Sequence, residues 1–219
     1  MLLVLSLNLA FYTNEGDPMS WVSGNYYLSQ SERENNAALI WEYFGGRGWT
    51  AEAVAGMLGN MEQESTINPG IWQGLTVGTG GYGLVQWTPY TKYANWAGNQ
   101  WENNGTLECQ RIEYEINLTG EDAQWIQTAA YPFSMADYTQ MTMDPADMAR
   151  AWMKNYERAG DEQEAARRQY ALNWYAFIGG QPEPPEPGPD EPTAQDQVPI
   201  WLLAAWGNKN RISRSNLTL

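Results

Sequence analysis

The sequence predicts a mainly α-helical fold. Apolar residues recur at helical spacing in several segments, while the alternation of apolar and polar residues that marks a half-buried strand is scarce. Helix-capping residues precede these segments, and glycine or proline turn signals follow them. At 219 residues, of which 43% are hydrophobic, the chain is long enough to bury the core of one domain and to carry extensions.

The first two predicted helices have the clearest boundaries. Residues 31–34 (SERE) form a capping box directly before an apolar run, which predicts a helix over residues 32–44. Thr50 precedes a second helix, over residues 51–64, which ends before the turn sequence Asn68-Pro69-Gly70.

The middle of the chain is predicted to be less regular. Residues 70–87 are rich in glycine and should form loops with short extended pieces. Thr88-Pro89 has the pattern of an N-cap followed by proline at the first helical position, which predicts a helix through about residue 97. Asp144-Pro145 has the same pattern and opens another helix. Further helices are predicted over residues 106–118 and 161–178.

Composition divides the chain into four parts. We predict an N-terminal extension over residues 1–24, a domain over 25–180, a Pro/Glu-rich linker over 181–197 and a C-terminal tail segment over 198–219. The tail is either the start of another domain or a segment that docks on a partner. The apolar start of the chain lacks the basic residues and cleavage site of a signal peptide, so we favour translation from Met19 over a leader. No stretch has the roughly 20 apolar residues of a membrane span.

The composition also excludes several function classes. A formal net charge of −14 argues against a nucleic-acid partner, because a phosphate backbone needs a cationic face. The chain has no histidine and one cysteine, Cys109, which excludes Ser-His-Asp catalysis and gives no metal site of the Cys/His type. Hard ions with oxygen ligands are still compatible with this composition, but the sequence has no DxDxDG loop, and we expect no metal and no cofactor. The remaining carboxylates favour acid-catalysed glycosidic cleavage, and the twelve Trp and thirteen Tyr residues suit either a core or a carbohydrate groove.

Glu64 is the candidate general acid. Val54, Met57, Leu58 and Met61 define the buried face of the second helix. At about 100° per residue, Glu64 lies within roughly 20° of Met57, whereas Glu62 lies about 140° away. A partly buried carboxyl group keeps its proton to higher pH, as a general acid must. The alternative is a helix-end residue that bonds exposed groups nearby.

The residues around Glu64 resemble a known signature. Glu64-Ser65, Asn68-Pro69 and residues 83–87 (GLVQW) resemble lysozyme-like and lytic transglycosylase domains, in which Glu-Ser at a helix end precedes Gly-Leu-x-Gln. The strings GMLGNMEQESTINPGIW and GYGLVQWTP are similar to the phage tail lysozyme family, as are residues 155–158 (NYER). The resemblance covers residues 25–178 and implies a lysozyme-like helical domain with a glycine-rich loop and short-strand segment.

The resemblance implies a role for each matched residue. Glu64 would protonate the oxygen of the β-1,4 bond between N-acetylmuramic acid and N-acetylglucosamine. Ser65 would orient that carboxyl group or the acetamido group, unless it is a turn residue that bonds its own backbone. Gln86 would bind sugar or water, unless its amide ties the loop to the helix.

Aromatic and glycine residues complete the predicted substrate site. Tyr82 and Trp87 are candidates for stacking on a sugar ring, with core packing as the equal alternative. Tyr156 is a third candidate, although its spacing with Met148 and Trp152 favours packing. The glycines at positions 80, 81 and 83 would let the backbone approach the glycan.

The sequence does not identify a second catalytic carboxylate, and the type of reaction is therefore not determined either. Glu102, Asp122 and Asp137 lie in predicted loops, and nothing selects one of them. Two carboxylates would hydrolyse the bond, whereas Glu64 alone would give the anhydro product of a lytic transglycosylase. Hydrolysis is favoured. A catalytically inactive glycan-binding module or a structural tail protein is the alternative function.

The resemblance also implies a setting. The substrate would be the glycan strands of peptidoglycan, and the tail segment would contact other phage tail proteins. Because peptidoglycan lies outside the cytoplasm, we expect the protein in the virion, at the phage tail, or outside the cell.

Overall fold

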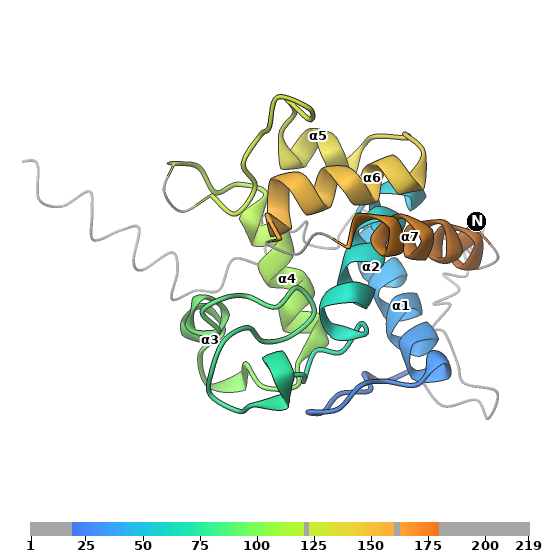
Figure 1. The fold of residues 1–219 in the computed structure, drawn as a ribbon. Helices are drawn as coiled ribbons and strands as arrows, with labels where there is room; N and C mark the ends of the chain where they lie inside the picture. The colour runs from blue at the N-terminus through green and yellow to red at the C-terminus, as the bar shows by residue number, and fades with distance from the viewer. Residues whose placement is uncertain (1–18, 121–122, 160–162, 180–219) are drawn as a thin grey trace, which may run out of the picture. The chain divides into compact units, whose positions relative to one another are not determined.

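Helices make up most of the computed structural model, which describes residues 19–120, 123–159 and 163–179 (Figure 1). This confirms the predicted mainly α-helical, lysozyme-like fold class. The α-helices are α1 (Gln30–Gly45), α2 (Ala51–Ser65), α3 (Thr91–Ala97), α4 (Gly105–Glu115), α5 (Met135–Thr139), α6 (Pro145–Trp152) and α7 (Glu164–Gly179). Short 3-10 turns lie at η1 (Gln73–Leu75) and η2 (Gly98–Gln100), and a π-helical turn, η4 (Met153–Glu157), continues α6.

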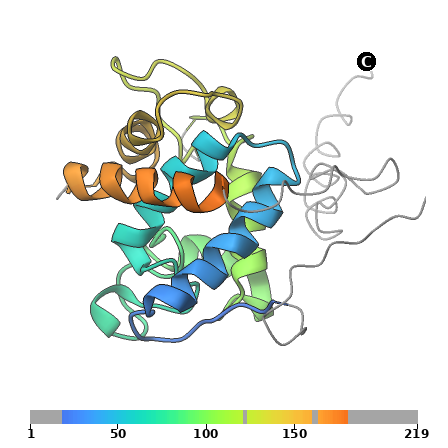
Figure 2. The same cartoon turned by 90° about the vertical axis from the view of Figure 1, so that its right-hand side faces the viewer.

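Helix α2 lies at the centre of the packing. It contacts α7 and α6 most extensively, and also α1 and α5. Figure 2 shows α7 lying across α2. The residues predicted as its buried face, Val54, Met57, Leu58 and Met61, are all 0% exposed. Burying this face holds the C-terminal end of α2, and therefore Glu64, in a fixed place.

Two groups of elements lie on opposite sides of α2 and α4. Helix α3 and the glycine-rich segment lie on one side, and α5 and α6 lie on the other (Figures 1 and 2). The glycine-rich segment contains loops, η1 and isolated bridges of Tyr82 with Trp72 and Trp87, in agreement with the predicted short extended pieces.

Helix α1 begins two residues earlier than predicted, because a different capping box is used. Ser29 is the N-cap, and both its backbone N–H and its hydroxyl donate to Glu32, at 2.8 and 2.7 Å. The predicted box at residues 31–34 is not formed, since Glu34 accepts from the Gln30 amide instead. Leu28 is buried directly before the cap and fixes where the chain enters the helix.

The predicted cap at Thr88-Pro89 is wrong. The Thr88 hydroxyl donates to the backbone oxygen of Gln86 at 2.9 Å, and α3 begins only at Thr91. The matching prediction at Asp144-Pro145 is confirmed, because the Asp144 carboxylate accepts from the N–H of Ala146 at 2.8 Å.

The ends of the described chain modify the predicted domain. Residues 19–24 were assigned to the extension, but Val22 exchanges hydrogen bonds with Asn36 of α1, and Gly24 does so with Asn68. The predicted linker and tail, and the choice between Met1 and Met19, fall outside the described residues. No helix within the described part is both long and apolar enough to cross a membrane.

Candidate active site

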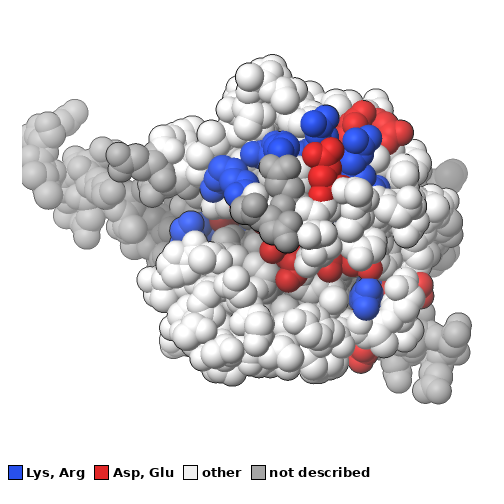
Figure 3. Space-filling view, viewed as in Figure 1, with Lys and Arg blue, Asp and Glu red and all other residues white. Residues whose placement is uncertain are grey.

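A pocket of about 500 Å³ opens at the C-terminal end of α2. One wall comes from the glycine-rich segment and the start of α3, and the other comes from the end of α2, the chain after η4 and α7. In Figure 3, acidic side chains are visible in the middle of this face, beside a group of Lys and Arg side chains. The charged residues of the lining are Glu64, Lys92, Glu157, Arg158 and Arg167.

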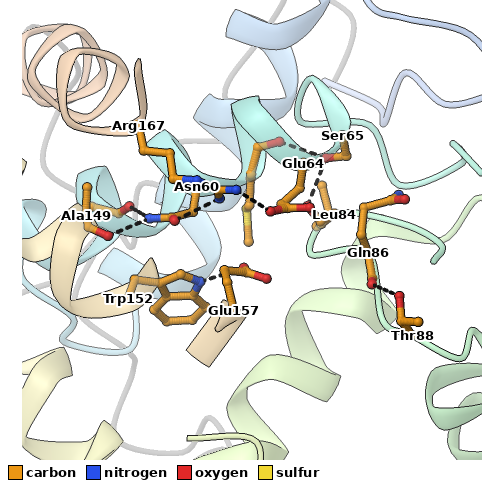
Figure 4. Close-up of polar contacts among 12 residues, drawn as sticks. Asn60, Glu64, Ser65, Leu84, Gln86, Thr88, Ala149, Trp152, Glu157 and Arg167 are labelled. Atoms are coloured by element: carbon orange, nitrogen blue, oxygen red, sulfur yellow. Dashed lines mark hydrogen bonds and ion pairs between the residues drawn. The ribbon is translucent and has the colours of Figure 1, made fainter. Parts of the chain in front are cut away.

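Glu64 lies in this pocket at the end of α2, with 21% of its side chain exposed. Its Oε1 accepts a hydrogen bond from Nη2 of Arg167 at 2.6 Å (Figure 4). Arg167 is only 3% exposed and also donates to Oδ1 of Asn60 at 3.0 Å. The Asn60 amide in turn donates to the backbone oxygens of Gly56 and Ala149. Helices α2, α6 and α7 therefore hold the Glu64 carboxylate jointly.

This environment differs from the predicted one. The sequence placed Glu64 at the helix end on the apolar side, and the side chain is indeed partly buried. The neighbour of the Glu64 carboxylate is a guanidinium group, however, and not the apolar side chain that we expected. Short N–H···O contacts of this kind are charge-assisted.

Glu157 is the second carboxyl group in the pocket, and the sequence reasoning missed it. It is the last residue of η4 and is half-buried. Its Oε1 accepts a hydrogen bond from the indole nitrogen of Trp152 at 2.9 Å. Burial, and secondly the charge of Glu64, raise the pKa of Glu157 to about 8. At neutral pH this carboxyl group therefore retains a proton.

Ser65 lies beside the site but serves the backbone. Its buried hydroxyl contacts the backbone oxygens of Met61 and Leu84, each at 2.9 Å, and accepts from the N–H of Asn68. The alternative of a turn residue that bonds backbone groups is therefore the one observed. These contacts fix the segment after Gly83 against the end of α2.

Gln86 and Trp87 line the pocket, but each is already engaged. The Gln86 amide donates to the backbone oxygens of Ile71 and Gly83, which ties the loop together. The Trp87 ring is 3% exposed, stacks on Tyr93, and donates its N–H to Glu115 at 3.0 Å. Neither side chain offers an open ring face or a free amide N–H pair to a sugar.

Tyr82 and Tyr156 lie in the core rather than in the pocket lining. Tyr82 is 1% exposed, and its hydroxyl accepts from the N–H of Asn103. Tyr156 is 0% exposed, stacks on Trp152 and hydrogen-bonds Glu115. Core packing, the alternative considered for both tyrosines, is what the structure shows.

Gly83, in the glycine-rich segment, lies against a buried carboxyl group. Gly83 has φ +79°, and a Cβ there would lie 2.5 Å from Oε2 of Glu108. Glu108 is fully buried and accepts from the N–H of Leu84 at 2.6 Å. Gly83 therefore admits a buried carboxyl group that anchors the loop, and the approach of this backbone to a glycan stays a prediction.

Of the three predicted second carboxylates, the two that the structure describes, Glu102 and Asp137, do not line the pocket. Glu102 is exposed on the loop before α4. Asp137 accepts from the backbone N–H and hydroxyl of Ser134 as part of the α5 capping box, and these bonds lower its pKa. Asp122 lies outside the described residues.

Signals for the missed residues are present in the sequence. Arg167 shares its spacing with Ala171, Trp174 and Ile178, the buried face of α7. An arginine in an apolar stripe indicates a buried cation that needs a carboxylate partner. Glu157 belongs to the string that carried the family resemblance. No cluster of potential metal ligands occurs among the residues that the structure describes.

Comparison with known proteins places the chain in a family. Residues 35–178 match the family model described as phage tail lysozyme. The chain belongs to the phage tail lysozyme family. A relative in Bacillus phage B103, named Morphogenesis protein 1, is 40% identical over 162 residues, which cover 72% of this chain and 43% of the relative. The family match spans α1 to α7, so every residue of the Glu64, Glu157 and Arg167 cluster lies inside it.

Proposed function

We propose that this member of the phage tail lysozyme family cleaves the β-1,4 bond between N-acetylmuramic acid and N-acetylglucosamine in peptidoglycan, with Glu64 as a catalytic carboxyl group. The observation that carries the proposal is a helix-end carboxylate held by Arg167 in a pocket that also contains Glu157. Paired acidic groups beside a bound sugar are the usual means of cleaving a glycosidic bond.

The lining of the pocket suits a glycan strand. It contains amide side chains from Gln63, Gln73 and Gln124, and an exposed aromatic ring from Tyr27. Amides match the hydroxyl and acetamido groups of the sugars, and an aromatic face matches their C–H faces. Tyr27 replaces the buried Tyr82 as the proposed stacking ring.

We place the protein at the phage tail, where it would open the cell wall locally. The family description and the name of the B103 relative support this setting, because the first refers to phage tails and the second to morphogenesis. The C-terminal tail segment remains the proposed contact with other tail proteins.

The experiment compares wild type with Glu64→Gln on purified peptidoglycan, with released muropeptides analysed by mass spectrometry. We expect the variant to lose at least about two orders of magnitude in rate, because an amide neither donates nor accepts the proton. Thermal unfolding shows whether the variant is folded. Equal release by both proteins would remove Glu64 from the reaction.

Glu102→Gln is the matched control, since Glu102 is an exposed carboxylate outside the pocket. Its activity should equal that of wild type. A wild-type protein that binds peptidoglycan but releases no muropeptides would contradict the proposed activity and support the glycan-binding alternative.

A further inference from the structure

A buried carboxyl group behind the pocket carries an inference that rests on the proposed function. Glu115, the last residue of α4, is 1% exposed and is not part of the pocket lining. Its Oε1 accepts from the indole N–H of Trp87 at 3.0 Å and from Nε of Arg111 at 2.8 Å, and its Oε2 accepts from the hydroxyl of Tyr156. One carboxylate therefore joins the glycine-rich segment to the π-helical turn η4.

The partners of Glu115 belong to the two walls of the pocket. Trp87 lines the wall that the glycine-rich segment forms. Tyr156 directly precedes Glu157, which lines the pocket from η4. The Tyr156 ring also stacks on Trp152, with 4.3 Å between the ring centroids, and the Trp152 indole donates to Glu157 at 2.9 Å. A shift of the Glu115 carboxylate would therefore move both walls.

A second carboxyl group of α4 acts on the same segment. Glu108 precedes Glu115 by seven residues, which is nearly two helical turns, and it is fully buried on the same face. It accepts from the N–H of Leu84 at 2.6 Å, while the hydroxyl of Ser65 donates to the backbone oxygen of Leu84 at 2.9 Å. Ser65 follows Glu64 at the end of α2. The buried face of α4 therefore also fixes the glycine-rich wall against the helix that carries Glu64.

The surroundings of Glu115 suit an ionised carboxylate whose value lies in geometry. Arg111 supplies the opposite charge, and all the groups that contact the two oxygens are hydrogen-bond donors. A buried ion pair contributes little net stability, because the cost of desolvation offsets the attraction. Fully satisfied polar groups in a core do, however, fix the positions of their partners more narrowly than apolar packing does.

We propose that Glu115 is a positioning residue of the proposed active site, and that it fixes the two walls of the pocket relative to each other without touching the substrate. A displacement of about 1 Å in an active site can slow a reaction by about 10²-fold. Loss of the bridge should therefore lower kcat. KM should change less, because every residue that lines the pocket is retained.

Glu115→Gln and Tyr156→Phe test the bridge with little change in shape. The glutamine keeps an oxygen for the Trp87 indole but loses the charge, and the phenylalanine keeps the ring on Trp152 but loses the hydroxyl. We expect each variant to lower kcat on purified peptidoglycan by about 10- to 100-fold. Rates are measured well below the Tm of each variant, so that lost stability alone would leave kcat unchanged.

Glu113 and Tyr43 provide the matched controls, because they form a similar contact on the same helix. The Tyr43 hydroxyl donates to Oε2 of Glu113 at 2.8 Å, and Nε of Arg47 lies 3.4 Å from the same oxygen. The pocket lining includes none of these side chains. Glu113→Gln and Tyr43→Phe should lower the Tm but keep the wild-type kcat. Equal losses of kcat in the two sets of variants would overturn the proposal.

A second test needs no activity. No hydrogen bond or ring contact joins Trp87 directly to Tyr156 among the residues that the structure describes. The NMR signal of the Trp87 indole N–H should nevertheless shift in Tyr156→Phe, because both groups donate to one carboxylate. It should keep its wild-type position in Tyr43→Phe. An unchanged signal in Tyr156→Phe would overturn the bridge.

The outcomes separate the positioning role from the proposed function. A wild-type kcat in Glu115→Gln and Tyr156→Phe, beside an inactive Glu64→Gln, would overturn the role of Glu115 and leave the function standing. If Glu115→Gln does not fold, the rate and the NMR signal of Tyr156→Phe decide. A wild type that releases no muropeptides would refute the function, and the positioning role with it.

Discussion

Arg167 is the residue on which the candidate site depends most. It is 3% exposed and bridges Asn60 and Glu64. Arg167→Met should lower the free energy of unfolding by about 3 kcal/mol, because it leaves buried polar partners without their cation. Activity should fall together with stability, since the Glu64 carboxylate loses its support. Chemical denaturation and muropeptide release measure the two effects.

The next residue in the chain is the control for Arg167. Arg168 pairs with Asp147, but both side chains are well exposed, at 39% and 46%. Arg168→Ala should change the free energy of unfolding by less than about 1 kcal/mol and leave activity intact. Equal losses in the two variants would contradict the proposed difference between a buried and an exposed arginine.

At the scale of single elements, the start of α1 distinguishes the structure from the sequence prediction. Ser29→Ala should destabilise the protein by about 1 kcal/mol, because it removes the N-cap hydroxyl that contacts Glu32. Ser31→Ala should have a much smaller effect, since Ser31 is exposed within the first turn. The opposite order in thermal unfolding would favour the box predicted over residues 31–34.

The contact between α2 and α7 should be sensitive to side-chain size. A Cβ at Gly59 would lie 2.5 Å from the backbone oxygen of Arg167 and 2.9 Å from Cβ of Ala171. Gly59→Ala should therefore cost about 1–3 kcal/mol and reduce activity, because α7 must move away and carry Arg167 with it. Both losses can be measured in one purified variant.

Gly179→Ala is the matched substitution, because nothing lies within 4 Å of an added Cβ at that helical position. It should be neutral or slightly stabilising, as alanine favours helix. A wild-type activity and stability for Gly59→Ala would show that the two helices are not in close contact in solution.

Elements whose signals are local could be predicted from the sequence. Thr50, Asp144-Pro145 and the apolar face around Met57 each act on neighbouring residues, and each was placed correctly. Two overlapping capping boxes were available at the start of α1, and the choice depends on the burial of Leu28, which is a tertiary contact. Helix α5, only five residues long, gave too little periodicity to be found.

In the candidate site, too, local features could be predicted from the sequence and tertiary contacts could not. Glu64 could be placed at the inner end of its helix from spacing alone. Its partner Arg167 lies 103 positions away, so the ion pair has no local signal. The raised pKa of Glu157 likewise arises from burial and from Glu64, neither of which a linear pattern contains. Conversely, the sequence suggests Tyr82 and Trp87 as rings that stack on a sugar because it does not show that both side chains are buried.

For the whole molecule, buried acids should make the protein more stable at mildly acidic pH than at mildly alkaline pH. Burial raises the pKa of Glu108 well above its ordinary value, and that of Glu157 to about 8. Between the ordinary value of 4.5 and these raised values, the unfolded chain releases protons that the folded chain keeps. Folding is therefore favoured as pH falls through this window.

Two other acids limit the effect at low pH. Hydrogen bonds from Ser29 and Ser134 lower the pKa of Glu32 and Asp137, so their stabilisation is lost only as pH falls below their ordinary values. Scanning calorimetry should give a higher Tm near pH 5 than near pH 8. Glu108→Gln, which keeps an oxygen to accept the Leu84 N–H, should reduce that difference. A Tm that rises from acid to alkaline pH would contradict this account.

The ion pair between α2 and α7 also has a consequence for protein synthesis. Glu64 leaves the ribosome 103 residues ahead of Arg167. At typical rates of elongation, roughly 5–20 s pass before the arginine has been added. Nascent chains and products of premature termination before position 167 therefore carry the glutamate without its cation. The proposed active site is therefore completed only after nearly the whole domain has been translated.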